Sequence, residues 1–324
     1  MQHQIVFLVP EGLVNWGSII AVSEILQWAD DHWQGRGRKK RLKMFLAVLN
    51  QEATAPKMHF PVLSQMNMYE ITSPDMIIIP SLSQQYKSIL GSGRAYVDWI
   101  NRQHLNGAEI ASICTGAFLL AATGLVDKMP CATHWDAADE LRDMFPKVQV
   151  CLEVLTANKG IYTNGGGYSF LNLALFLVEK YFDRPTAIHC GKMFQIDIGR
   201  STQSPFAIFA GQKTHGDPVV IKAQEYIEEH ISERISPEAL ATELAASRRN
   251  FDRRFIKATG NTLMGYIQRA RMEIAKKALE ETDCHVSDIM LTCGYNDEKA
   301  FREAFRKVVG LLPLDYKARY RRFS

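Results

Sequence analysis

Residues 247–316 read SRRNFDRRFIKATGNTLMGYIQRARMEIAKKALEETDCHVSDIMLTCGYNDEKAFREAFRKVVGLLPLDY. Apolar residues recur in this stretch at helical spacing: Phe251 and Phe255 are four positions apart, as are Phe301 and Phe305. Each pair therefore lies on one side of a helix that buries it. A long helix is expected between the two pairs, over 262–281. A short helix is expected before each pair, over 237–244 and 286–292. This order predicts two helix-turn-helix units around one long helix.

The second helix of each unit turns its polar side chains away from the buried stripe. A helix of this kind can enter a DNA major groove of roughly 12 Å and read base edges with its N-terminal half. The outward residues expected from the spacing are Arg248, Arg249, Asp252 and Arg253 in the first unit, and Lys299, Arg302 and Arg306 in the second.

The quoted stretch closely resembles the DNA-binding domain of the AraC/XylS family. The matching positions include Ser247, Phe251, Arg253, Phe255, Gly260, Tyr266, Arg271, Ala275, Leu279, Gly294, Tyr295, Phe301, Phe305, Gly310 and Pro313. The resemblance implies base contacts from Arg249, Asp252 and Arg253 in the first unit, and from Lys299, Ala300 and Glu303 in the second. The family commonly has Arg where Glu303 stands, and a carboxylate near phosphates repels, although it can accept from a cytosine amine. The second unit is therefore expected to contribute less affinity.

Charge along the chain agrees with a polyanionic partner at the C-terminal end. The net charge of the whole chain is +3, but residues 247–324 alone carry +7, whereas 217–246 carry −5 and 1–216 carry +1. A basic surface confined to one region is the electrostatic pattern of a nucleic-acid interface. Double-stranded DNA is the expected partner.

The first half of the chain alternates short apolar runs with helix-like stretches. Residues 4–9, 43–49, 76–79 and 109–113 are rich in Val and Ile without a polar alternation. Continuous apolar strands separated by helices indicate a parallel sheet with helices on both faces. A Gly- and Ser-containing stretch over 187–216 follows. The predicted organisation is an α/β domain over 1–186, a linker over 187–216 and an all-α DNA-binding domain over 217–324.

One cysteine of the α/β domain stands at a strand-to-helix turn. The strand 109–113 runs into Cys114 and Thr115, and a helix follows directly. This arrangement has the form of a nucleophile elbow, and a helix N-terminus favours a thiolate. His134 lies twenty residues further on, before Trp135.

Residues 109–135 resemble the PfpI-type branch of the class I glutamine amidotransferase-like superfamily. The resemblance implies a flavodoxin-like fold with Cys114 and His134 at the family's Cys and His positions. Two of the family's features do not match: its acidic residue falls at Ser18, and its glycine pair falls at Ser81-Leu82. We therefore expect ligand binding without catalysis. The candidate ligand-binding residues are Ser18, Ser81, Cys114, Thr115, His134, Trp135, Asn164 and Gly165.

Together the two resemblances imply a member of the GlxA-like group, in which a PfpI-like domain precedes the AraC-type domain. The expected function is a transcription regulator that responds to a small, often nitrogenous metabolite and dimerises through its first domain. The alternatives are a PfpI-type Cys-dependent enzyme, such as an amidase, hydratase or glyoxalase, with a DNA-binding tail, and a DNA-binding protein without an effector. No cofactor or metal site is expected. The lack of a secretory signal, of a membrane span and of paired cysteines predicts a cytoplasmic protein.

Overall fold

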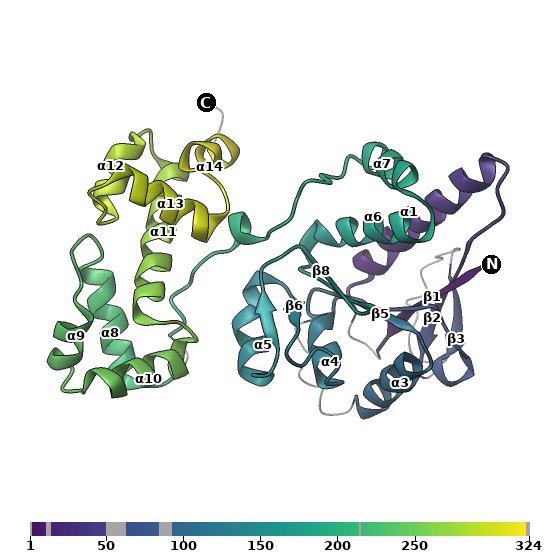
Figure 1. The fold of residues 1–324 in the computed structure, drawn as a ribbon, viewed down its shortest axis with the longest axis horizontal. Helices are drawn as coiled ribbons and strands as arrows, with labels where there is room; N and C mark the ends of the chain where they lie inside the picture. The colour runs from purple at the N-terminus through teal and green to yellow at the C-terminus, as the bar shows by residue number, and fades with distance from the viewer. Residues whose placement is uncertain (1, 11–13, 50–62, 84–92, 214, 322–324) are drawn as a thin grey trace. The chain divides into compact units, whose positions relative to one another are not determined.

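The computed structural model describes residues 2–10, 14–49, 63–83, 93–213 and 215–321. The chain divides into two compact units, Met1–Gln203 and Ser204–Ser324. Figure 1 traces the elements of each unit. No helix within the described ranges is both long enough and apolar enough to cross a bilayer.

The first unit is built on a sheet with the strand order β3-β2-β1-β4-β5-β9-β8. All neighbouring strands run parallel except β8 and β9 at one edge. If β4, β5 and β9 are counted as the third to fifth strands of the parallel core, the core order is 2-1-3-4-5, which is flavodoxin-like. The strands are β1 His3–Val9, β2 Leu42–Val48, β3 Ser64–Asn67, β4 Met76–Ile79, β5 Glu109–Ile113, β8 Leu155–Asn158 and β9 Ile161–Asn164. A separate two-stranded sheet pairs β6 Pro130–Ala132 with β7 Gln149–Cys151.

Both faces of the main sheet are covered by helices. In β1, Ile5 and Phe7 belong to the core under α1, α6 and α7, whereas Val6 and Leu8 belong to the core under α3 and α4. Because every side chain of such a strand is buried, the strand reads as a continuous apolar run. The helices are α1 Trp16–Gly35, α3 Arg94–Leu105, α4 Gly116–Ala122, α5 Ala138–Met144, α6 Phe170–Tyr181 and α7 Arg184–Met193. The α/β fold class expected from the sequence is confirmed.

The second unit consists of helices, as expected. They are α8 Pro218–Glu229, α9 Pro237–Glu243, α10 Arg248–Thr259, α11 Leu263–Glu281, α12 Val286–Thr292, α13 Glu298–Val309 and α14 Pro313–Tyr320. The long helix α11 joins two separate cores: Tyr266 packs with Phe251 and Phe255, and Leu279 packs with Phe301 and Phe305. The pairs α9–α10 and α12–α13 are the two helix-turn-helix units. Gly260 and Gly310 end α10 and α13 in the left-handed conformation, where glycine carries no steric penalty.

The stretch 187–216 differs from the expected linker. Its first part continues α7, where Ala187 and Cys190 are buried in the core with α1 and α6. Its last part packs along the second unit: Lys276 Nζ donates to the Ala207 carbonyl at 2.6 Å, and Tyr266 Oη donates to the Gly211 carbonyl at 2.9 Å. The glycines and serines of 187–216 therefore do not mark a free linker, because tertiary contacts hold both the first and the last part of this segment. We refer to residues 204–213 as the strap of the second unit.

Candidate functional sites

A pocket of about 550 Å³ opens at the carboxyl edge of the main sheet. Its wall comes from the segments that follow β1, β4 and β5, where the strand order reverses direction. Open α/β sheets bind ligands at this point. Of the residues expected to bind a ligand, Ser81, Cys114, Thr115 and His134 line the pocket, whereas Ser18, Trp135, Asn164 and Gly165 do not.

Cys114 has a left-handed backbone, with φ of +56°. Its amide donates to the Asn164 carbonyl at 2.8 Å, and Thr133 Oγ1 donates to the Cys114 carbonyl at 2.9 Å. A Cβ on Gly166 would lie 2.2 Å from the Cys114 Cβ, so only glycine fits beneath the cysteine. The strand-to-helix turn is thus a strained elbow that presents the thiol to the pocket.

The backbone amides opposite the cysteine already have partners. The Ser81 amide donates to Ser18 Oγ at 3.4 Å, and the Leu82 amide donates to Thr115 Oγ1 at 2.9 Å. These amides stand where the PfpI-type resemblance places oxyanion donors. Because side chains of the protein occupy them, neither is a ready donor for charge that develops on a substrate. Ser18 is fully buried and supports this loop instead of lining the pocket.

His134 is held in one tautomer. Its Nδ1 accepts from the Asp136 amide at 3.3 Å, so the neutral ring carries its proton on Nε2. Burial lowers the pKa of His134, and the nearby Asp136 carboxylate opposes this effect. The ring is therefore neutral near pH 7, and neither nitrogen is free to take a proton, because Nδ1 accepts from the Asp136 amide and Nε2 carries the ring proton.

The other three expected residues support the pocket from behind. Asn164 is fully buried; its Nδ2 donates to the Val154 and Ser169 carbonyls, and its Oδ1 accepts from the Gly166 amide. A Cβ on Gly165 would lie 2.2 Å from Gln203 Nε2. The Trp135 amide donates to Gln203 Oε1 at 3.2 Å. Asn164 is the last residue of β9, and its side chain stabilises the turn instead of lining the pocket.

The sequence reasoning missed acidic and aromatic residues at the pocket. Asp136 and Glu140 line it, four residues apart, as do Tyr168 and Phe170. Tyr168 is 80% exposed, and its ring centroid lies 5.8 Å from that of Phe170. The sequence signal that could have indicated the two carboxylates is the four-residue spacing of Asp136 and Glu140 shortly after His134. In the described ranges no group of three or more metal-ligating side chains lies together.

In the first recognition helix, α10, the four expected DNA-binding residues divide into two kinds. Arg248 donates through Nε to Asp252 at 2.8 Å and through Nη1 to Glu238 of α9 at 2.8 Å. Arg249 and Arg253 are exposed, and Arg253 donates through Nη2 to Asn250 Oδ1 at 3.1 Å. Arg248 and Asp252 therefore fix the start of α10, and Arg249 and Arg253 are the side chains available to DNA.

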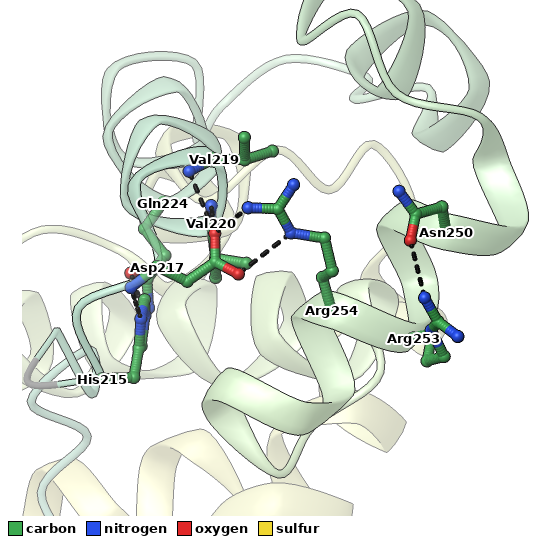
Figure 2. Close-up of polar contacts among 8 residues, drawn as sticks. All are labelled: His215, Asp217, Val219, Val220, Gln224, Asn250, Arg253 and Arg254. Atoms are coloured by element: carbon green, nitrogen blue, oxygen red, sulfur yellow. Dashed lines mark hydrogen bonds and ion pairs between the residues drawn. The ribbon is translucent and has the colours of Figure 1, made fainter.

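A contact of α10 that the sequence reasoning missed ties it to α8. Arg254 donates through Nε and Nη2 to the two carboxylate oxygens of Asp217, at 3.0 and 2.6 Å (Figure 2). Asp217 also caps α8 by accepting from the Val219 and Val220 amides. The Arg254 guanidinium holds the pKa of Asp217 below its usual range. This bidentate pair fixes how α10 sits against α8.

The second recognition helix, α13, begins at Asp297, whose side chain accepts from the Ala300 amide at 2.7 Å. Lys299, Ala300 and Glu303 are exposed, and Arg302 pairs with Glu298 one turn earlier. The expected residues of both helices are therefore at the surface. The charge that α13 presents is more balanced than that of α10.

Arg271 of α11 joins the two halves of this unit. Its guanidinium donates to the Ile231 and Glu233 carbonyls, which follow α8, and to the Gly294 carbonyl in the turn of the second helix-turn-helix. A Cβ on Gly294 would lie 2.8 Å from Arg271 Nη2, so glycine permits this close approach. One side chain thus satisfies main-chain acceptors from both halves.

Comparison with known proteins agrees with this description. Residues 240–319 match a family model described as a helix-turn-helix domain. The HTH-type transcriptional regulator GbdR of Pseudomonas aeruginosa is 24% identical over 226 residues, which cover 68% of this chain and 61% of GbdR. The HTH-type transcriptional regulator GlxA of Rhizobium meliloti is 24% identical over 211 residues, which cover 64% of this chain and 64% of GlxA. The match thus spans less than two thirds of either relative.

A solved structure gives a further comparison. An AraC family transcriptional regulator from Pseudomonas putida has a TM-score of 0.48 and 13% sequence identity, over 59% of this chain and 99% of that one. The helix-turn-helix domain expected from the sequence is confirmed by the family model and the regulator relatives: the second unit is a helix-turn-helix domain, and the chain is similar to HTH-type transcriptional regulators.

Proposed function

We propose that this protein is a sequence-specific DNA-binding transcription regulator. The observation that carries the proposal is the presence of two helix-turn-helix units on one long helix, with Arg249 and Arg253 exposed on the first recognition helix. Arginine pairs with guanine O6 and N7 in the major groove, and each such pair supplies roughly 1–3 kcal/mol of base discrimination.

Selection from a random duplex pool tests this proposal. The full chain should enrich a defined sequence, and its affinity for that sequence should fall steeply with salt, because bound Arg and Lys release counterions. Duplexes recovered without any shared sequence, from a well-folded protein, would contradict sequence-specific binding.

We further propose that the pocket of the first unit binds a small nitrogenous cation. Asp136 and Glu140 supply carboxylates at the pocket, and Tyr168 supplies an exposed aromatic face. Ammonium groups bind carboxylates directly and are attracted to aromatic faces, where the interaction contributes about 0.5–2 kcal/mol. The volume of about 550 Å³ is that of a small-molecule site.

A thermal-shift screen tests the ligand class. Amino acids and quaternary ammonium compounds should raise the melting temperature of the full chain, because a ligand that binds only the folded form stabilises it. Neutral compounds of the same shape should not. Asp136→Asn should remove the shift, whereas Asp143→Asn, which changes an exposed carboxylate outside the pocket, should keep it. Equal shifts in both variants would refute a role for Asp136.

We propose that this pocket binds without catalysis. The Ser81 and Leu82 amides donate to hydroxyl groups of the protein, and the neutral His134 has no nitrogen free to accept a proton, so neither oxyanion donors nor a general base stand ready for Cys114. The enzyme alternative has one observation in its favour: Cys114 is at a strained elbow in the same pocket as His134. Steady turnover of amides, isonitriles or 2-oxoaldehydes by the wild type, lost in Cys114→Ser, would favour the enzyme.

We also propose that the protein acts as a homodimer through its first unit, in the cytoplasm where DNA is reached. Three apolar side chains, Ile188, Met193 and Ile198, are exposed on and after α7. Sedimentation of residues 1–203 measures the assembly, and a monomer at micromolar concentration would rule out dimerisation through this unit.

A further inference from the structure

A second pocket, of about 790 Å³, lies entirely within the second unit, beside the first recognition helix. One wall is the C-terminal half of α10, with Arg253, Arg254 and Lys257. The other wall is His215–Pro218, which comprises the turn before α8 and the first residue of that helix. We call it the Lys257 pocket. Of its cations, Arg253 is also an expected base contact, whereas Arg254 and Lys257 are not, and the pocket shares no residue with the ligand pocket of the first unit.

The charge of the Lys257 pocket is positive. Arg253, Arg254 and Lys257 each contribute a cation, and Asp217 is its single carboxylate. That carboxylate is bound by Arg254 at 2.6 and 3.0 Å and by two amides, so its charge is already compensated. Lys257 is exposed, and no carboxylate in the described part of the chain pairs with it. An incoming anion would meet uncompensated positive charge.

The walls of this pocket are fixed before any ligand arrives. His215 Nδ1 accepts from the Asp217 amide at 3.0 Å, and His215 Nε2 donates to Gln224 Oε1 at 3.1 Å (Figure 2). Gln224 is fully buried and donates through Nε2 to the Gly211 carbonyl at 2.7 Å. The chain of contacts from Gly211 to Arg254 therefore holds the loop before α8 against α10. Such prior ordering lowers the entropic cost of binding.

The position of the pocket indicates which anion it takes. Arg249, Arg253 and Lys257 follow one another at four-residue intervals, so they form one exposed stripe along α10. When the N-terminal half of a recognition helix reads bases, the flanking elements meet the phosphates at the groove edge. We propose that the Lys257 pocket binds a phosphate group of the DNA backbone, beside the major groove that α10 reads. This inference rests on the proposed DNA-binding function.

The first test uses the salt dependence of binding by the full chain. Lys257→Gln should weaken binding to the selected duplex and to a scrambled duplex by the same factor. It should also reduce the slope of log K against log salt by about 0.9, the value for one lost phosphate contact. Lys277→Gln, which removes an exposed cation from α11 outside this pocket, is the matched control and should change neither quantity. A loss confined to the selected duplex would make Lys257 a base contact and overturn the proposal.

The second test locates the phosphate. Single phosphates of the selected duplex are replaced one at a time by neutral methylphosphonates. At one position at the groove edge, the methylphosphonate should weaken binding by the wild type but should not weaken binding by Lys257→Gln any further. This is because two groups that contact each other have non-additive effects. Equal losses in both proteins at every position would refute the contact.

A free anion is the competing source of the same chemistry. If inorganic phosphate raised the melting temperature of the wild type but not of Lys257→Gln, and no methylphosphonate position showed coupling, the pocket would be a free-anion site and the DNA contact would be wrong. Failure of the wild type to select any sequence would instead contradict the proposed function, so the two failures are distinguishable.

Discussion

Arg248 and Arg249 are adjacent in the chain, but their surroundings give them different roles. Arg248 is bound to Glu238 and Asp252, so it joins the two helices of the first helix-turn-helix unit. Arg249 is exposed, and nothing in the described ranges forms an ion pair with it. Helical spacing places both arginines on the outward side of α10, whereas only Arg248 has carboxylate partners in the described part of the protein.

Alanine substitutions should separate these roles. Arg253→Ala should lower the ratio of affinities for selected and scrambled duplexes by the equivalent of about 1–3 kcal/mol, because a bidentate base contact is lost. Arg248→Ala should leave this ratio nearly unchanged and lower the melting temperature of the second unit instead. Titration of both duplexes and thermal unfolding provide the readouts. An unchanged ratio in Arg253→Ala would show that Arg253 makes no specific base contact.

The Asp217–Arg254 pair predicts a pH dependence of stability. The pKa of Asp217 is lowered in the folded state, chiefly by the hydrogen bond from Arg254, so the charged carboxylate stabilises the fold. This contribution is present above the ordinary aspartate pKa of about 3.9 and is lost as the pH falls through the lower folded value. We therefore expect the free energy of unfolding of residues 204–324, measured in urea between pH 3 and 7, to rise less with pH in Asp217→Asn than in the wild type. Equal pH profiles would contradict this role.

At the scale of elements, the strap changes where the DNA-binding unit begins. Lys276 is 4% exposed, and its ammonium group is satisfied by the Ala207 carbonyl and by Glu273. The Phe209 ring packs against Tyr266, with centroids 5.0 Å apart. A fragment that starts at residue 217 lacks these partners.

Fragments 204–324 and 217–324 should consequently differ in stability. Removal of the strap takes one acceptor from the Lys276 ammonium group and the Phe209 ring from its contact with Tyr266, and a hydrogen bond to a charged group contributes about 1.5–3 kcal/mol. The shorter fragment should unfold at lower urea concentration, and Lys276→Met should recover part of the loss in that fragment only. Equal midpoints for the two fragments would show that the strap contributes nothing.

The degree to which a strand is buried decides whether its bounds could be predicted from the sequence. The central strands β4 and β5 begin and end where the apolar runs do, because both of their faces are buried. The edge strands β3 and β8 were missed because they are only partly buried and carry polar residues. Cys114 and His134, both named from the sequence, line one pocket of the structure, but the inward direction of Asn164 depends on tertiary hydrogen bonds that no local pattern encodes.

At the scale of the whole molecule, the two units meet in the chain at the peptide bond between Gln203 and Ser204. The residues on each side of this bond are held by contacts within their own unit. Gln203 is 2% exposed and bonds to Thr133, Glu153 and Trp135 in the first unit. Trp135 directly follows His134 of the ligand pocket. On the other side, the strap is fixed to the second unit. We predict that a shift of the His134 loop on ligand binding is passed to the strap along the covalent chain.

Insertion of Gly-Ser-Gly-Ser between Gln203 and Ser204 tests this connection. Each unit should keep its own binding, because its internal contacts are untouched. The change in DNA affinity on addition of the ligand should disappear, since flexible residues absorb the displacement. The same insertion between Asn106 and Gly107, in an exposed turn, is the control and should leave the response intact. A full response in the junction variant would exclude coupling through this bond.

The left-handed backbone at Cys114 has an evolutionary consequence. A side chain at a positive φ costs about 1–2 kcal/mol, so glycine is the residue that thermodynamics alone would select there. Cys114→Gly should accordingly melt higher than Cys114→Ala, a reversal of the usual order, in which glycine is less stable by about 0.5–1 kcal/mol. If unfolding experiments give that order, the thiol persists in this chain against the demands of stability. Selection for what the sulfur does in the pocket would then be the reason that it is kept.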